Sequence, residues 1–350
     1  MRLCLLFLLC LPSLAQAHAF GPRYTLPIPY WMFIYGGALA LVLSFVIMAF
    51  VMTDTRHTPQ SPATRTWLPR WWTAQTRINH SLRVCLQLLS LFLLILCIVS
   101  GFIGSIDSSR NFNMTFFWVI FSLGAVYVCV VFGGWYEVLN PWRVLVSMLA
   151  RVLPLLKNGL YTYPQRLAYY PALLLYIVFI WVELLAHTRP FSLSAWLLGY
   201  TVLNVLGAAL IGRRAWFKYA EFTAVLLRLI SRMAPLQYVA DAPRSHRWQL
   251  QWPLLGLLRD TPRELSVLFF VLFMLSSTSF DGLQETAWWF NIVWRDATGL
   301  LTPLLGTPPI YAYVWLRPWY TLYESIVLAL SPLLYGAVFV MFVWLGELCV

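Results

Sequence analysis

Long apolar stretches constrain this chain more than any other feature. A bilayer core about 30 Å thick requires roughly 20 apolar residues in a helix. No alternating pattern of about ten residues, typical of membrane barrel strands, appears, so the expected fold is all-α. We predict a polytopic bundle of about seven transmembrane helices. The expected spans are residues 30–53, 84–105, 115–136, 169–188, 193–212, 264–281 and 320–346.

The first 17 residues have the form of a secretory signal peptide. Arg2 is followed by an apolar run too short to span a bilayer, and residues 15–17 match the small-x-small cleavage pattern. Cleavage would leave His18 as the first residue of a single transmembrane domain, 18–350. Retention of the apolar run as a short anchor is the alternative.

Basic residues indicate the orientation. Segments 54–83, 137–168 and 213–263 hold 5, 4 and 9 of the 24 Lys and Arg residues, so these segments are expected inside. We therefore predict a protein of the bacterial inner membrane with its mature N-terminus in the periplasm and its C-terminus in the cytoplasm. Topology and anionic lipid account for the net charge of +11, which makes the lipid bilayer, and not nucleic acid, the expected partner.

A run of leucines and basic residues follows the third span. Asn140 before Pro141 is a plausible helix start, and the run to Pro154 is amphipathic, which predicts a helix on the inner surface. A re-entrant or gating element is the alternative. When the sequence is shifted by 81 residues, Trp135 aligns with Trp216 and several other residues also match. These matches predict a second inner-surface helix and a parallel duplication of the chain. Chance matches are the alternative.

Acidic residues gather on the predicted outer side. Glu183 and Glu324 lie within predicted spans, where an ionisable group usually faces the bundle interior and has a partner. Asp281, Glu285 and Asp296 lie near the same side. These positions predict an outward-facing polar cavity between the fourth, sixth and seventh spans. The N-terminal segment and a lid over residues 286–319 are expected to cover it.

Nitrogen ligands reach the same side. A free amine and an imidazole at His18 would suit copper, nickel or zinc, and His187, four residues after Glu183, is expected on the same helix face. The candidate metal ligands are His18, His187, Glu183 and Asp281; Glu324 and Asp296 are further cavity residues. Proton or cation transfer, and purely structural pairing of these charges, are the alternatives.

Three short strings resemble a family of bacterial multi-pass membrane proteins labelled fenitrothion hydrolase. They begin at His18 (HAFGxRYxLP, where x is any residue), Asn140 (NPWR) and Ser279 (SFDGL). The resemblance implies a membrane-bound hydrolase of organophosphate triesters. For such a reaction, a metal held by His18, His187 and Asp281 or Glu285 would activate water, which makes Asp281 and Glu285 the candidate catalytic residues. Against this, the sequence has no H-E-x-x-H, G-x-S-x-G or Walker pattern.

The leading hypothesis is a membrane protein that handles a cation, a metal or a small solute at its outer face. A divalent transition metal, copper or zinc, is the candidate cofactor. The triester hydrolase is a second hypothesis, and an assembly or scaffold subunit is a third.

Overall fold

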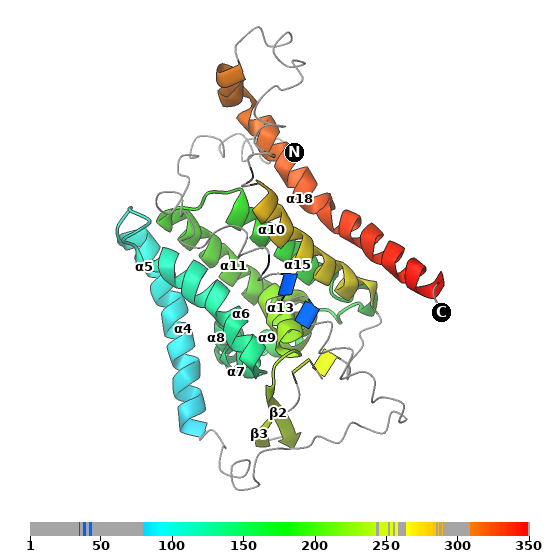
Figure 1. Cartoon of the computed structure of the whole chain (residues 1–350). Helices are drawn as coiled ribbons and strands as arrows, with labels where there is room; N and C mark the ends of the chain where they lie inside the picture. The colour runs from blue at the N-terminus through cyan, green and yellow to red at the C-terminus, as the bar shows by residue number, and fades with distance from the viewer. Residues whose placement is uncertain are drawn as a thin grey trace.

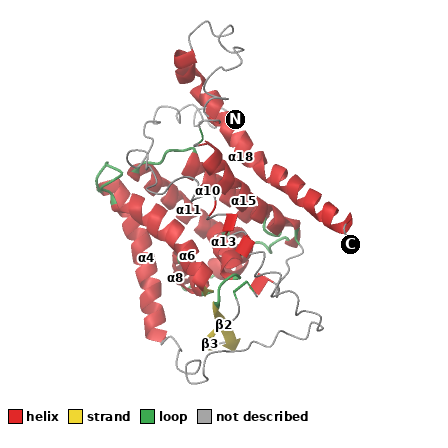
Figure 2. Ribbon diagram, viewed as in Figure 1, coloured by secondary structure: helices red, strands yellow, loops and turns green. Residues whose placement is uncertain are grey.

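The fold is described from a computed structural model of the chain. It describes residues 35, 38, 39, 42, 43, 80–242, 245–250, 253, 254, 256, 257, 264–284, 286, 289 and 309–348. Helices dominate this part of the chain and pack side by side, as Figures 1 and 2 show. The N-terminal segment with His18, most of the first predicted span, Glu285, Asp296 and most of the predicted lid lie outside the described residues, although residues 309–319 of that lid are helical.

Two helices and their connections form a first unit. Helix α4 (His80–Ile103) runs to a loop at residues 104–111, and the chain then returns through α5 (Phe112–Met114), the π-helical η2 (Thr115–Leu123) and α6 (Gly124–Val131). The strand β1 (Phe132–Gly133) and the short helices α7 (Trp135–Leu139), α8 (Pro141–Leu149) and α9 (Leu155–Asn158) complete it.

A second unit repeats this order after the 3-10 turn η3 (Gln165–Leu167). Helix α10 (Tyr170–Leu184) runs to a loop at residues 185–189, and α11 (Pro190–Ile211) returns. The chain then continues through α12 (Arg213–Ala215), the π-helical η4 (Trp216–Ala220) and α13 (Phe222–Ser231). We call the end of the bundle with loops 104–111 and 185–189 the loop side.

The 81-residue shift relates the two units. Helices α4 and α10 both end at the loop side, and their last residues, Ile103 and Leu184, are 81 residues apart. The two N-cap residues Asn140 and Glu221, which start α8 and α13, have the same separation. Equivalent helices therefore run in the same direction, which supports the predicted parallel duplication.

A glycine with positive φ follows the returning helix in each unit: Gly212 is the C-cap of α11, and Gly134 follows β1 and is the N-cap of α7. Gly134 has φ 80° and Gly212 has φ 78°, a conformation that residues with a side chain rarely adopt. Gly212 also lies against Gly159, where an added Cβ would stand 2.3 Å from the Gly212 nitrogen. These turns redirect the chain into α7 and α12, so α8 and α13 do not continue the helices before them.

Helices α15 (Leu265–Gln284) and α18 (Pro309–Leu348) complete the described bundle. The backbone nitrogen of Tyr169, next to the start of α10, donates to the Ser266 hydroxyl at 3.1 Å, so α15 begins beside α10. Helix α18 lies along α15 at the edge of the bundle (Figure 1). Its Ser331 hydroxyl donates to Ser276 of α15 at 2.8 Å.

A small sheet lies at the end opposite the loop side, which we call the hairpin side. Strands β2 (Leu236–Ala242) and β3 (Ser245–Leu250) pair antiparallel, and β1 pairs in parallel with the start of β2. The hairpin was not expected from the sequence. It follows α13, outside the bundle helices, so the all-α description holds for the bundle itself (Figure 2).

Five described helices are long and apolar enough to cross a membrane, which makes the chain a membrane protein. They correspond to the second, third, fifth, sixth and seventh predicted spans: Ser81–Ile103, Phe112–Val131, Pro190–Ile211, Leu265–Gln284 and Pro318–Leu345. The fourth predicted span, 169–188, contains the shorter α10 because the helix ends at Leu184.

The prediction of two inner-surface helices is wrong for α13. Seven of its ten residues are buried, because it packs against α6, α7 and α10. Helix α8 buries its first turn through Pro141 and Trp142 and exposes Met148. Both helices thus begin inside the bundle, as the re-entrant alternative requires.

Candidate functional site

Three of the helices expected to enclose a polar cavity are neighbours. Helices α10, α15 and α18 contact one another, and Glu183 of α10 lies close enough to Asp281 of α15 for like-charge repulsion. Glu324 of α18 lies beside Tyr320 and Trp289, and the Trp289 indole donates to the Tyr320 hydroxyl at 2.8 Å. The acids predicted on the loop side therefore come from adjacent helices.

The prediction that Glu183 and His187 share one helix face is wrong. Helix α10 ends at Leu184, and His187 lies in the following turn with φ 45°. Among the described residues, no group of three or more His, Cys, Asp or Glu side chains could hold one metal ion. His18 lies outside them, so the metal site that includes it stays a prediction.

A different acid occupies the interior of the bundle. Glu221 is the N-cap of α13, and none of its surface is exposed. Within the described part of the chain, no lysine or arginine forms a salt bridge with it. An ionised side chain in such a place requires hydrogen bonds from its surroundings.

Five donors supply these hydrogen bonds. Glu221 Oε1 accepts from the hydroxyls of Tyr200 and Thr223 and, at 3.1 Å, from the Thr223 nitrogen. Glu221 Oε2 accepts from Asn140 Nδ2 at 3.0 Å and from the Ala224 nitrogen at 2.8 Å. Two of the donors are backbone groups in the first turn of α13, where the helix dipole also favours a negative charge.

The carboxylate lies deep in the bundle. Tyr200 is halfway along the 22-residue α11, so it stands about 15 Å from either end of that helix. Beside Tyr200, the Trp142 ring packs with its centroid 4.9 Å from that of the Tyr200 ring, and the Trp142 indole nitrogen donates to the Thr201 hydroxyl at 3.0 Å. The starts of α8 and α13 are therefore held at the level of the middle of a membrane-spanning helix.

Asn140 and Glu221 are counterparts in the two repeats. They are 81 residues apart, they cap equivalent helices, and they contact each other directly. If an approximate twofold axis relates the repeats, a residue that contacts its own counterpart lies on that axis. Asn140 Oδ1 meanwhile accepts from the Arg143 nitrogen at 3.0 Å and so caps α8.

A second pair marks the same axis near the loop side. Asn113 Nδ2 donates to the Ser194 hydroxyl at 3.0 Å across the same 81-residue separation, and to the Pro190 carbonyl at 2.7 Å. Gly101 of α4 leaves room for this contact, because a Cβ there would come within 2.1 Å of the Ser194 oxygen. The two pairs fix the repeats to each other at two depths.

The repeats differ in how they satisfy a tryptophan. The Trp216 indole nitrogen donates to Asn204 Oδ1 at 2.7 Å. The indole nitrogen of its counterpart Trp135 has no hydrogen-bond partner among the described residues. The Cys129 thiol, a weak acceptor, lies near Trp135. The sequence explains the difference, because Leu123 stands 81 residues before Asn204. The first repeat has lost, or never had, that acceptor.

A cavity of about 340 Å³ lies between the repeats, and we call it the interrepeat cavity. Helices η2 and α6 form one wall, and α10, α11 and α13 form the other. Its lining is almost entirely apolar. Its polar members are Trp118, Ser122, Trp142, Trp196, Tyr200 and Thr223.

The cavity lies where the approximate symmetry fails. Helix α4 of the first repeat packs closely along α11 of the second. The equivalent contact would join α10 to η2 and α6. At that place the centroids of the Phe117 and Phe179 rings are 6.3 Å apart, beside the cavity. One of the two contacts between the repeats is thus closed and the other is partly open.

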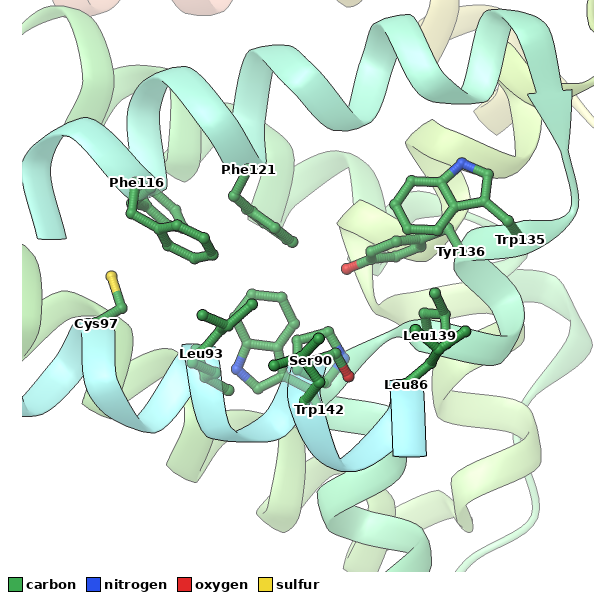
Figure 3. A pocket seen from close by; sticks show the side chains of 14 residues that line it. Leu86, Ser90, Leu93, Cys97, Phe116, Phe121, Trp135, Tyr136, Leu139 and Trp142 are labelled. Atoms are coloured by element: carbon green, nitrogen blue, oxygen red, sulfur yellow. The ribbon is translucent and has the colours of Figure 1, made fainter. Parts of the chain in front are cut away.

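A second cavity of about 220 Å³ lies within the first repeat, between α4, η2 and the segment α7–α8. Figure 3 shows side chains from all three facing it. Tyr136 of its lining bonds to Thr223 at 2.8 Å, which links this wall to the Glu221 cluster.

Comparisons of the chain with known protein families, curated proteins and solved structures found no match.

The sequence did not single out Glu221. Glu221 lies in segment 213–263, whose basic residues predicted an inner loop, so we did not expect its carboxylate inside the bundle. The repeat contained the necessary signal, because the 81-residue shift places Glu221 on Asn140, the predicted start of a helix.

Proposed function

We propose that this membrane protein binds a small, mainly apolar solute in the interrepeat cavity and handles or transports it. The observation that carries the proposal is the position of this cavity, between two parallel repeats and beside their approximate twofold axis. In transporters built from repeats, substrates bind near the middle of the membrane where the repeats meet.

The lining favours an apolar solute over an ion. Its wall is formed largely by Leu, Phe, Val and Trp side chains, and it contains no Asp, Glu, Lys or Arg among the described residues. A charged solute would lose its hydration without gaining a partner there. Such an apolar solute could enter the cavity from the lipid.

Movement of one repeat against the other would give access. The polar pairs Asn113–Ser194 and Asn140–Glu221 lie on the axis, where a rocking motion displaces atoms least. The open contact between α10 and η2 could close while the contact between α4 and α11 opens.

Gly199 provides a direct test, because it is an exposed residue of the cavity wall and an added Cβ would meet nothing within 4 Å. Gly199→Phe would place a ring at the edge of the cavity, where it can obstruct the space. The matched control is Gly282→Phe, since Gly282 of α15 has equally open surroundings and does not line the cavity.

The measurement is saturable binding of naphthalene to protein in phosphatidylcholine nanodiscs, with empty nanodiscs as blank. We expect the native chain and Gly282→Phe to bind alike and Gly199→Phe to bind at least about tenfold more weakly, which corresponds to about 1.4 kcal/mol. Equal binding by both variants, or no saturable binding at all, would refute the proposal.

Cation or metal handling at the loop side is a second proposal, supported by the proximity of Glu183 and Asp281. Copper and zinc content of purified protein would fall in His18→Ala, His187→Ala and Asp281→Asn if these residues are ligands. Unchanged metal content would exclude the assignment. N-terminal sequencing that found residues 1–17 still attached would remove the amine of His18 from the site.

Hydrolysis of an organophosphate triester is the alternative that the resemblance implies. It requires release of nitrophenol from a triester by purified protein, with a loss of rate in Asp281→Asn or Glu285→Gln. A structural subunit would instead tolerate both substitutions without any change in activity or binding.

A further inference from the structure

We infer that the Ser122 hydroxyl is the polar recognition point of the interrepeat cavity, and that the cavity takes a neutral apolar molecule carrying one hydroxyl group. This inference rests on the proposed binding function. It names the chemical class of the solute and the residue that selects it.

Three polar groups of the cavity wall already have protein partners. The Tyr200 and Thr223 hydroxyls bond to Glu221, and the Trp142 indole bonds to Thr201. Ser122, which is half-buried, makes no side-chain hydrogen bond with any described residue.

The lack of a partner sets Ser122 apart from other serines on these helices. A helical serine usually donates to the carbonyl three or four residues earlier. Serines of α4, α15 and α18 do so, namely Ser90, Ser100, Ser276, Ser277, Ser279, Ser325 and Ser331.

The local backbone gives a physical reason for this difference. Ser122 is in the π-helical η2, whose wider turn bonds each amide to the carbonyl five residues earlier and shifts the carbonyls that a serine would reach. Its neighbours Phe117, Trp118 and Phe121 face the same cavity. The hydroxyl is therefore available to a solute within an otherwise apolar space.

Two indole nitrogens of the wall, those of Trp118 and Trp196, also lack a hydrogen-bond partner among the described residues. The Trp196 side chain is 44% exposed at the bundle surface, and an indole can only donate. A serine hydroxyl can both donate and accept, which matches a solute hydroxyl. Because the described wall contains no charged side chain, the solute is neutral.

The experiment compares 2-naphthol with naphthalene in nanodiscs, using the native chain, Ser122→Ala, Ser122→Thr and Trp196→Phe. We expect Ser122→Ala to weaken 2-naphthol binding about fivefold, the effect of one hydrogen bond, and to leave naphthalene binding within about twofold. Ser122→Thr keeps the hydroxyl and is expected to retain 2-naphthol affinity.

Three results would overturn the inference while leaving the cavity proposal intact. These are an unchanged 2-naphthol affinity in Ser122→Ala, an equal loss for both probes, and a selective loss in Trp196→Phe in place of Ser122→Ala. Failure of both probes to bind the native chain would instead refute the cavity proposal itself, and this inference with it.

Discussion

Replacing Glu221 by glutamine tests whether the axial carboxylate holds the two repeats together. The change keeps the size of the side chain but turns one acceptor oxygen into an amide donor. If the amide oxygen takes the position near Tyr200 and Thr223, the new amino group faces Asn140 Nδ2 and the Ala224 nitrogen, which are both donors.

The magnitude follows from those two lost bonds. A buried donor left without a partner costs about 1 to 3 kcal/mol, so Glu221→Gln should lower the free energy of unfolding by about 2 to 6 kcal/mol. The assay is equilibrium unfolding of the purified protein from mild detergent into SDS. Glu137→Gln is the matched control, because Glu137 is exposed and should change stability by less than about 0.5 kcal/mol.

The twofold relation adds a sharper test. Asn140→Asp alone places a second carboxylate against Glu221 and should destabilise the protein. Combined with Glu221→Gln, it moves the charge to the counterpart position, where the amide introduced at position 221 can donate to the new carboxylate and both helices keep a cap. The double variant should therefore be more stable than the sum of the single changes predicts.

Two outcomes would refute this reasoning. The first is a loss below about 0.5 kcal/mol in Glu221→Gln, which would mean that the buried hydrogen bonds contribute little. The second is additivity in the double variant, which would mean that residues 140 and 221 do not interact across the axis.

Three further outcomes can be checked in the same protein. Trp216→Phe should lower the free energy of unfolding by about 1 to 3 kcal/mol because it leaves a buried acceptor unpaired, whereas Trp135→Phe should be near neutral; equal losses would contradict the difference between the repeats. Gly212→Ala should cost about 1 to 2 kcal/mol at φ 78°, and an unchanged SDS midpoint would show that the turn tolerates a side chain. Hydrogen bonds from the Ser109 nitrogen and hydroxyl lower the pKa of Asp107. Any stabilisation from this carboxylate is therefore present above its ordinary pKa and is lost as the pH falls through the lowered pKa. Ser109→Ala should raise the pKa of Asp107 in a carboxyl NMR titration, and an unchanged pKa would exclude the Ser109 hydroxyl as a cause.

Helix positions could be predicted from the sequence because membrane spans follow from apolar length alone. Where helices end is a more local matter. Residues 132–136 are apolar enough to extend the third span, yet Gly134 turns the chain before α7. The fourth predicted span includes residues 185–188, but α10 stops at Leu184 before the segment that leads to Pro190. Hydropathy does not distinguish a buried turn from a helix.

The candidate site was harder to predict for an electrostatic reason. Segment 213–263 holds nine basic residues and three acids, so Glu221 reads as part of a charged loop. Burial of Glu221 depends on donors from Asn140 and Tyr200, which are distant in sequence and meet it only through the fold. The loop-side acids were predicted as a group because they share one end of the helices, and Glu183 and Asp281 do lie close together.

The contact between Asn140 and Glu221 has a consequence for the ancestry of the fold. In a dimer of identical chains, the twofold axis would bring two identical residues together, so two glutamates would repel and two asparagines would carry no charge. A complementary amide and carboxylate can face each other on the axis only after the two copies are encoded separately and mutate independently. Gene duplication would thus have allowed an amide to face a carboxylate where a symmetric ancestor had to place two identical side chains.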